Sequence, residues 1–374
     1  MKKVLLIATG GTIASRQSQN GLAPALDADS LLRYLDNPNY NSRCNNDESC
    51  NSGCACGSNN DESYDSGCDT AKLPDCTIEG VSIMDVDSTN MSPELMGTIA
   101  QTVCDNYNSY DGFVVTHGTD TMAYSATAVS YMLKGLHKPV VFTGSQIPME
   151  QPGSDAYANL GDSIAFACEN RAGVYVVFNG KVIKGTCACK VKTKSMDAFV
   201  SVNEPDIACI NNGVVMYDRN NSDSGDNSAS CENADEDNSV NVSISEISAD
   251  TRLCSNITVV KLFPGIDEKI FDYIKDNYKG VIVECFGVGG APDGYSHIAG
   301  KLIELAHSGI AVVITTQCLY EGIDINIYQV GESLSDDRII LGGKMTTEAL
   351  TMKLMWALAH FEGLKEIKAY IEQS

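Results

Sequence analysis

The feature that most constrains the fold is the apolar run Val4–Ala8, which leads directly into Thr9-Gly-Gly-Thr12. A run this short with no polar residue is typical of a strand buried on both faces of an α/β sheet. Two glycines then allow a sharp turn at the carboxyl end of the strand, where open α/β sheets bind their ligands. Thr12 is therefore either a nucleophile beside bare backbone N–H donors or a solvated threonine on a glycine turn.

Strand, loop and helix alternate along most of the chain. We expect further strands at Ser82–Val86, Gly112–Thr116, Pro139–Thr143, Gly173–Phe178, Ile257–Leu262, Gly280–Phe286 and Ile310–Thr315. Helical periodicity is found at Asp120–Leu133, Asp155–Glu169, Ile298–His307 and Thr346–Ala359. This alternation predicts the α/β class, with two domains that each contain a largely parallel sheet with helices on both faces. We place an N-terminal, catalytic domain at residues 1–211, an acidic insertion and linker at 212–256, and a C-terminal α/β domain at 257–374.

Two segments differ in composition from the rest, Tyr40–Cys76 and Asp218–Arg252. Both are rich in Asn, Ser and Asp, and together they carry −12 of the net charge of −23. Low apolar content and high charge cannot offset the entropy of ordering, so we predict mobile surface insertions. More than half of the net negative charge therefore lies outside the predicted core fold and says little about the substrate.

Charge and hydropathy exclude two classes of partner. A net charge of −23 would repel the phosphates of a nucleic acid, and no apolar run is long enough to span a bilayer. The start Met1-Lys-Lys and the apolar residues after it are interpreted as a first strand rather than a signal peptide, so we expect a cytoplasmic protein. Its 15 cysteines should then stay reduced, although six of them fall within Tyr40–Cys76.

Polar residues follow three more of the expected strands. Val114–Thr121 repeats the pattern of the first motif, and we expect Thr119 to cap the next helix with Asp120 in its first turn. We interpret His117 as a hydrogen-bonded residue at the strand end rather than a base. Thr143-Gly-Ser-Gln146 and Asp85-Val-Asp-Ser-Thr-Asn90 complete the set. Four such ends on one edge of a sheet would form a pocket of hydroxyls and carboxylates.

Two of these motifs carry a family resemblance. Thr9–Ser15 together with His117-Gly-Thr-Asp-Thr-Met122 resembles the two signatures of the bacterial-type L-asparaginases. Further stretches resemble the cytoplasmic, type I branch of that family, namely Asp87–Met91, Thr143–Pro148, Ser154–Leu160, Asp197–Phe199 and Thr315–Leu319. The resemblance covers nearly the whole chain except the two predicted insertions.

The resemblance implies hydrolysis of asparagine, a small-molecule substrate, to aspartate and ammonia by a threonine nucleophile, with no cofactor, metal or nucleotide. It implies a homodimer or homotetramer and the catalytic residues Thr12, Thr119, Asp120 and Lys190. The position of Lys190 is obtained by counting back from Asp197, and the neighbouring Lys192 and Lys194 remain alternatives. For substrate binding the resemblance implies Ser88, Thr119 and Asp120, flanked by Asp87 and Thr89.

The chain departs from the family at two positions. Leu22 stands where relatives often have a tyrosine that bonds the nucleophile, and Gly290 stands where several present an asparagine to the neighbouring subunit. Some type I relatives also bind asparagine at a second site, for which Thr316–Cys318 would be the equivalent segment.

Two other functions remain open. The asparaginase-like subunit of the archaeal tRNA-dependent amidotransferase shares both signatures, but it would carry an additional N-terminal domain and its tRNA would be repelled by the acidic charge. A metal-binding role for the cysteine-rich segment would use Cys54-Ala-Cys56. No pair of Cys-x₂-Cys spacings supports a zinc site, so an inert low-complexity loop is favoured.

Overall fold

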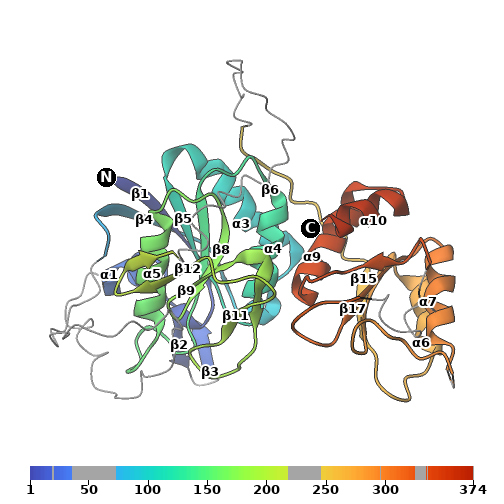
Figure 1. The fold of residues 1–374 in the computed structure, drawn as a ribbon. Coiled ribbons are helices and arrows are strands. Elements are labelled where there is room, and N and C mark those ends of the chain that lie inside the picture. Colours follow the sequence, from blue (N-terminus) through green and yellow to red (C-terminus); the bar gives the residue numbers. More distant parts are fainter. Residues whose placement is uncertain are drawn as a thin grey trace, which may run out of the picture.

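The fold is seen in a computed structural model, which describes residues 1–18, 21–35, 73–217, 246–294, 296–324, 334 and 336–373. Two sheets, each covered by helices, form an N-terminal and a C-terminal body (Figure 1). The α/β class predicted from the sequence is confirmed. The residue boundaries proposed for the domains stay a prediction.

The N-terminal body is built on an eight-stranded sheet with the order β13-β12-β9-β8-β7-β5-β1-β4. From β8 to β4 all neighbours are parallel, whereas β9, β12 and β13 are antiparallel additions at the other edge. The strands are β1 (Lys2–Gly10), β4 (Cys76–Val86), β5 (Gly112–Thr116), β7 (Pro139–Thr143), β8 (Gly173–Phe178), β9 (Lys181–Lys184), β12 (Ala208–Asn211) and β13 (Val214–Met216). The prediction for β4 was too short, because β4 is a partly exposed edge strand whose first half has no apolar run.

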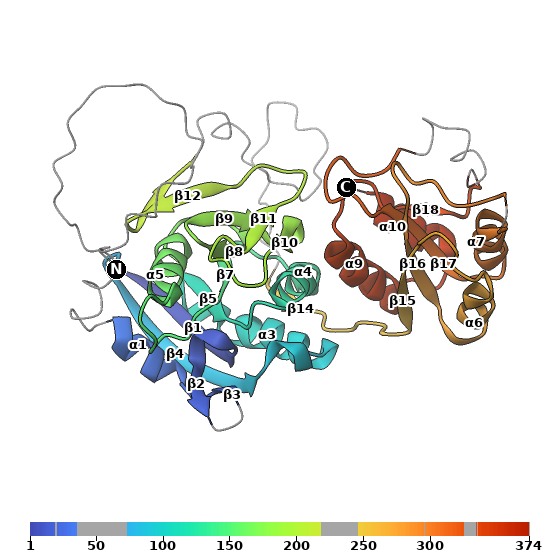
Figure 2. The same ribbon diagram turned by 90° about the horizontal axis from the view of Figure 1, so that it is seen from below.

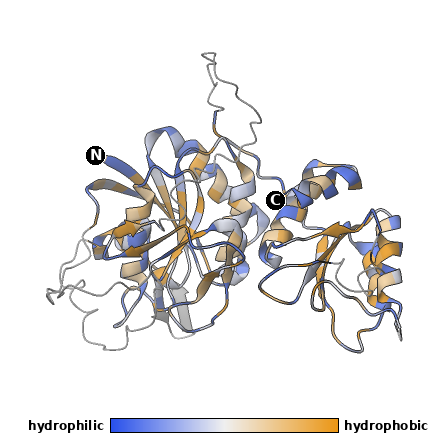
Figure 3. Cartoon of the chain, in the orientation of Figure 1, coloured by the Kyte–Doolittle hydropathy of each residue, from blue (hydrophilic) through white to orange (hydrophobic). Residues whose placement is uncertain are grey.

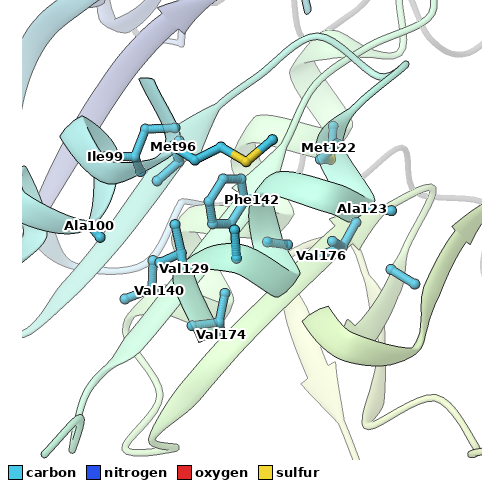
Figure 4. Packing of buried hydrophobic residues seen from close by; sticks show 14 of the residues in the cluster. Met96, Ile99, Ala100, Met122, Ala123, Val129, Val140, Phe142, Val174 and Val176 are labelled. Carbon is cyan, nitrogen blue, oxygen red and sulfur yellow. The ribbon is translucent and has the colours of Figure 1, made fainter. Parts of the chain in front are cut away.

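Helices cover both faces of this sheet. They are α1 (Ala28–Leu35), α3 (Pro93–Asn106), α4 (Met122–Met132) and α5 (Ala156–Ala167). Leu5 and Ile7 of β1 belong to the core under α3 and α4, whereas Val4 and Leu6 belong to the core under α1 and α5. Figure 4 shows the first of these cores, in which the fully buried Phe142 lies among residues of α3, α4 and β8. The first strand is therefore buried on both faces, as its sequence predicts.

The C-terminal body contains a parallel four-stranded sheet with the order β15-β16-β17-β18. Its strands are β15 (Ile257–Lys261), β16 (Gly280–Cys285), β17 (Ala311–Thr316) and β18 (Ile340–Leu341), and its helices are α6 (Lys269–Asn277), α7 (Ile298–His307), α9 (Thr347–His360) and α10 (Leu364–Glu372). Helices α6 and α7 cover one face, and α9 and α10 the other. In Figure 3 the central strands of both sheets are drawn mainly in hydrophobic colours.

Three short strand pairs lie outside the two main sheets. They are β2 (Ser15–Ser18) with β3 (Gly21–Pro24), β6 (Leu133–Lys134) with β14 (Ser248–Ala249), and β10 (Ala188–Lys190) with β11 (Phe199–Ser201). Short 3₁₀ turns are Thr12–Ala14, Ser88–Asn90, Tyr107–Ser109 and Gly185–Cys187.

The two bodies meet where α9 packs against α4 (Figure 2). Met352 and Met355 of α9 are part of the N-terminal core, so the joint is apolar. At its rim the imidazole Nε2 of His360 lies 2.7 Å from a carboxylate oxygen of Asp250. The ammonium group of Lys134 lies 4.6 Å from the centre of the Trp356 ring.

Most of the two predicted insertions lies outside the described residues, at 36–72 and 218–245. Residues at their carboxyl-terminal ends are described and are part of the fold. Cys76 begins β4, and Ser248–Ala249 pairs with β6. Within the part of the chain that the structure describes, no helix is long and apolar enough to cross a membrane.

Candidate active site

Four polar strand ends lie at one edge of the N-terminal sheet. Thr12 follows β1, Ser88 follows β4, Thr119 follows β5 and Gln146 follows β7. Strand β1 lies between β4 and β5, with β7 on the far side of β5, and all four strands are parallel. The carboxyl ends of parallel strands meet at the same edge, so the structure brings these residues together.

Two glycine turns touch at this edge. Gly11 has a φ of 81°, and a Cβ added to it would lie only 2.3 Å from the amide nitrogen of Gly118. A Cβ added to Gly118 would lie 2.4 Å from the hydroxyl oxygen of Ser88. Only residues without a side chain allow this approach. It places the half-buried Thr12 beside the turn that carries Thr119, with the buried Ser88 on the same side.

A close group of three polar side chains follows the second turn. The ammonium group of Lys190 donates one hydrogen bond to Thr119 Oγ1 and another to Asp120 Oδ1, each 2.7 Å long. The Lys190 side chain is only 16% exposed, whereas that of Asp120 is 56% exposed. Lys192, an alternative to Lys190, instead forms an ion pair with Asp197. The geometry therefore favours Lys190 as the lysine of the site.

The expected helix cap at Thr119 is wrong. Helix α4 begins at Met122, and the residue at its N-cap position, Thr121, forms no side-chain cap; its hydroxyl donates instead to the Ser88 carbonyl oxygen at 2.8 Å. Thr119 and Asp120 lie in the preceding turn, because their oxygens accept hydrogen bonds from Lys190 rather than from the start of the helix. Both side chains thus face a partner that is distant in sequence.

The segment with Asp87 and Thr89 forms a 3₁₀ turn. One carboxylate oxygen of Asp87 accepts hydrogen bonds from the amide and the hydroxyl of Thr89, both 2.9 Å long. These two residues bond each other and stabilise the turn that presents Ser88. They therefore flank the site.

Gln146 belongs to a motif that the sequence singled out, but we did not predict it as a site residue. Its side-chain oxygen accepts a hydrogen bond of 3.4 Å from the Thr119 hydroxyl. Its backbone amide, and that of Ile147, donate to the carboxylate of Asp155. Burial raises the pKa of Asp155, and these backbone hydrogen bonds oppose the rise. Gln146 follows an expected strand, as Thr119 does, and this shared position was the sequence signal that could have identified it.

His117 is fully buried, and its Nδ1 donates a hydrogen bond of 2.7 Å to the Gly118 carbonyl oxygen. Burial lowers the pKa of His117 to about 4. The imidazole is therefore neutral at physiological pH and supports the glycine turn, which agrees with its interpretation as a strand-end residue.

The remaining sequence features lie elsewhere. Thr316–Cys318 lines a cavity of about 260 Å³ between the two bodies, together with Glu284 and Glu348. A second asparagine site in this cavity stays a prediction.

The backbone amide of Gly290 donates to the Phe286 carbonyl oxygen in a tight turn. The side chain of Leu22 and the segment with Cys54 and Cys56 lie outside the described residues. Among the residues that are described, no group of three or more His, Cys, Asp or Glu side chains is arranged to hold a metal.

Replacement of Gly11 by alanine should disrupt this site more than the same change at Gly153. Both glycines have positive φ, at 81° and 75°, but a Cβ at Gly153 would have no atom within 4 Å. We expect Gly153→Ala to lower the free energy of unfolding by about 1–2 kcal/mol, the cost of the backbone conformation alone. Gly11→Ala should cost at least twice as much, because the atoms that it meets belong to backbone. Equal losses in urea unfolding would contradict the close contact of the two turns.

Stability should respond to the titration of His117. Its pKa is lower in the folded state, about 4 against 6.5, so the unfolded state takes up the proton first. The stabilisation is complete above pH 6.5 and is lost as pH falls to 4, by about 3 kcal/mol. The wild type should therefore lose its advantage in unfolding free energy over His117→Asn as the pH falls from 6.5 to 4. Other titrating groups contribute equally to both proteins and cancel in the difference. Parallel pH curves would show that His117 is not buried as a neutral ring.

Comparisons with known proteins identify the family of the chain. Residues 3–223 match the family model described as Asparaginase, N-terminal, and residues 256–371 match the Glutaminase/Asparaginase C-terminal domain. An L-asparaginase of Thermococcus kodakarensis is 33% identical over 372 residues, which cover 100% of this chain and 97% of that protein. A subunit of the glutamyl-tRNA(Gln) amidotransferase of Pyrococcus abyssi is 34% identical over 296 residues, covering 76% of this chain and 63% of that protein. The crystal structure of L-asparaginase I from Vibrio cholerae matches with a TM-score of 0.74 at 27% identity, covering 100% of this chain and 97% of that one.

Proposed function

Because the chain belongs to the asparaginase family and is thus an amidohydrolase, we propose that it hydrolyses L-asparagine to L-aspartate and ammonia with Thr12 as the nucleophile. The observation that carries the proposal is the group formed by Thr119, Asp120 and Lys190, with both hydrogen bonds from Lys190 at 2.7 Å, beside the turn that presents Thr12. A threonine hydroxyl is a weak nucleophile and requires a nearby proton acceptor, and a lysine in its neutral form can provide one.

In the proposed reaction the Thr12 oxygen attacks the carbon of the substrate's side-chain amide, and the hydroxyl proton passes to the amine of Lys190. The carbon–nitrogen bond then breaks, the nitrogen takes up a proton and leaves as ammonia, and an aspartyl ester remains on Thr12. Water activated by Thr119 and Lys190 hydrolyses this ester, which releases aspartate and restores the hydroxyl.

The charges of the site suit the two ends of an amino acid. Asp120 is largely exposed and its Oδ1 is bonded to Lys190, so Oδ2, which has no hydrogen bond to the described residues, is free to accept the substrate's α-ammonium group. The hydroxyl of Ser88 would donate to the α-carboxylate, because the single hydrogen of the Thr119 hydroxyl is directed at Gln146. We expect the enzyme to act in the cytoplasm as a homodimer or homotetramer, which size-exclusion chromatography with light scattering would measure.

The second candidate is a component of a tRNA-dependent amidotransferase, favoured by the similarity to the Pyrococcus protein. The net charge of −23 opposes binding of tRNA. Ammonia release from free asparagine, measured without tRNA or a partner protein, distinguishes the two functions.

Loss of the Thr12 hydroxyl should abolish turnover without unfolding the protein. Thr12→Ala removes a half-buried hydroxyl and leaves little cavity, so the unfolding midpoint should stay close to that of the wild type. Loss of a covalent nucleophile should lower kcat by several orders of magnitude, on the order of 10⁴ or more. Thr12→Ser keeps the hydroxyl and should retain measurable activity. A Thr12→Ala variant within tenfold of the wild type would refute the assignment.

Lys190 and Lys192 provide a matched pair for testing the lysine. Lys190→Met keeps most of the stem but removes the ammonium group that bonds Thr119 and Asp120. We expect its kcat to fall by at least about a hundredfold. Lys192→Met removes only an exposed ion pair with Asp197 and should leave kcat unchanged. The opposite outcome would show that Lys192 is the lysine of the site.

A further inference from the structure

The side chain of Gln146 connects Thr119 at the sheet edge with the loop that follows Lys190. Its Oε1 accepts a hydrogen bond of 3.4 Å from the Thr119 hydroxyl, and its Nε2 donates one of 3.0 Å to the backbone carbonyl oxygen of Ser195. Ser195 lies in the exposed loop 191–197, at the tip of the β10–β11 hairpin that carries Lys190. Gln146 therefore spans from the sheet edge to the loop that follows the lysine.

One end of this link is rigid. The backbone amide of Gln146 donates to both carboxylate oxygens of Asp155, at 3.1 and 3.0 Å, and Asp155 is itself buried. The other end is an exposed loop that is closed at its base by the backbone hydrogen bond from Val191 to Ala198 and by the exposed ion pair of Lys192 and Asp197. These contacts lie within the hairpin, whereas the hydrogen bond from Gln146 ties the tip of the loop at Ser195 to the sheet edge.

The partners also determine the direction of each hydrogen bond. A backbone carbonyl oxygen only accepts, so the amide nitrogen of Gln146 must face Ser195 and the amide oxygen must face Thr119. The Thr119 hydroxyl consequently donates its hydrogen to Gln146 and accepts one from Lys190. A lone pair of the Thr119 oxygen is therefore directed at Lys190, and the hydroxyl hydrogen points away from the lysine, toward Gln146.

We propose that Gln146 is a positioning residue, which orients the Thr119 hydroxyl relative to Lys190 and holds loop 191–197 against the site. It acts through Thr119 and Lys190 rather than on the substrate. The inference rests on the proposed function for its kinetic part, but the restraint on the loop follows from the structure alone.

Two substitutions and one control test the proposal. Gln146→Met keeps the length of the side chain but removes both hydrogen bonds. Gln146→Glu keeps the volume, places a negative charge near Lys190 and replaces the donor to Ser195 with an acceptor. Gln151→Met makes the same change at an exposed glutamine in the same connection between β7 and α5. Circular dichroism confirms folding, and Gln146→Glu carries the test if Gln146→Met does not fold.

The first measurement is limited trypsin digestion, with cleavage after Lys192 and Lys194 identified by fragment mass. Loss of the bond to Ser195 should speed this cleavage at least severalfold in both Gln146 variants, whereas Gln151→Met should match the wild type. Unchanged cleavage in the Gln146 variants would overturn the proposed restraint. This result does not depend on any enzymatic activity.

The second measurement is the steady-state kinetics of asparagine hydrolysis. Misorientation of Thr119 should lower kcat of Gln146→Met by about tenfold to a hundredfold while KM changes little. An unchanged kcat for Gln146→Met, or a rise in KM alone, would overturn the positioning role. A wild type without asparaginase activity would instead refute the proposed function and leave the trypsin result standing.

Discussion

The candidate site depends on one contact between two backbone turns. Gly11 and Gly118 approach so closely that a side chain on Gly11 would overlap the backbone of Gly118. Thr12 and Thr119 follow these glycines directly, so the contact sets the distance between the two threonines. Ser88 is tied to the same point, because its hydroxyl occupies the space that a Cβ on Gly118 would need. The parallel order of β4, β1 and β5 brings the three segments together.

The two halves of the site are held in different ways. Strand β1 is buried on both faces, with Leu5 and Leu6 in opposite cores, so the position of Thr12 is determined by dense packing. Lys190 comes from a two-stranded hairpin outside the main sheet and reaches the site through side-chain hydrogen bonds. Thr12, the proposed nucleophile, is thus placed by the main sheet, and Lys190 is placed by a hairpin whose Ala188 and Phe199 pack in the N-terminal core.

The sequence predicted the parts of the fold that depend on local patterns. The ranges of β5, β7 and β8 were correct because each strand is an unbroken apolar run. Helix α3 was not predicted, although Ser92 at its N-cap and Pro93 at its first position were signals for it. The start of α4 was wrong because Thr119 and Asp120 bond Lys190, a partner about seventy residues away that local propensity cannot reveal. The link from Gln146 to Ser195 depends on the same long-range folding of the hairpin and was missed for the same reason.

In the proposed mechanism Thr12 becomes covalently bonded to the substrate. Mass spectrometry of protein quenched with acid during turnover of asparagine would detect this bond, because an ester intermediate adds one aspartyl group to the nucleophile. We expect this adduct on the peptide that contains Thr12 and its loss in Thr12→Ala. An adduct on the peptide that contains Thr119, with none on Thr12, would refute Thr12 as the nucleophile.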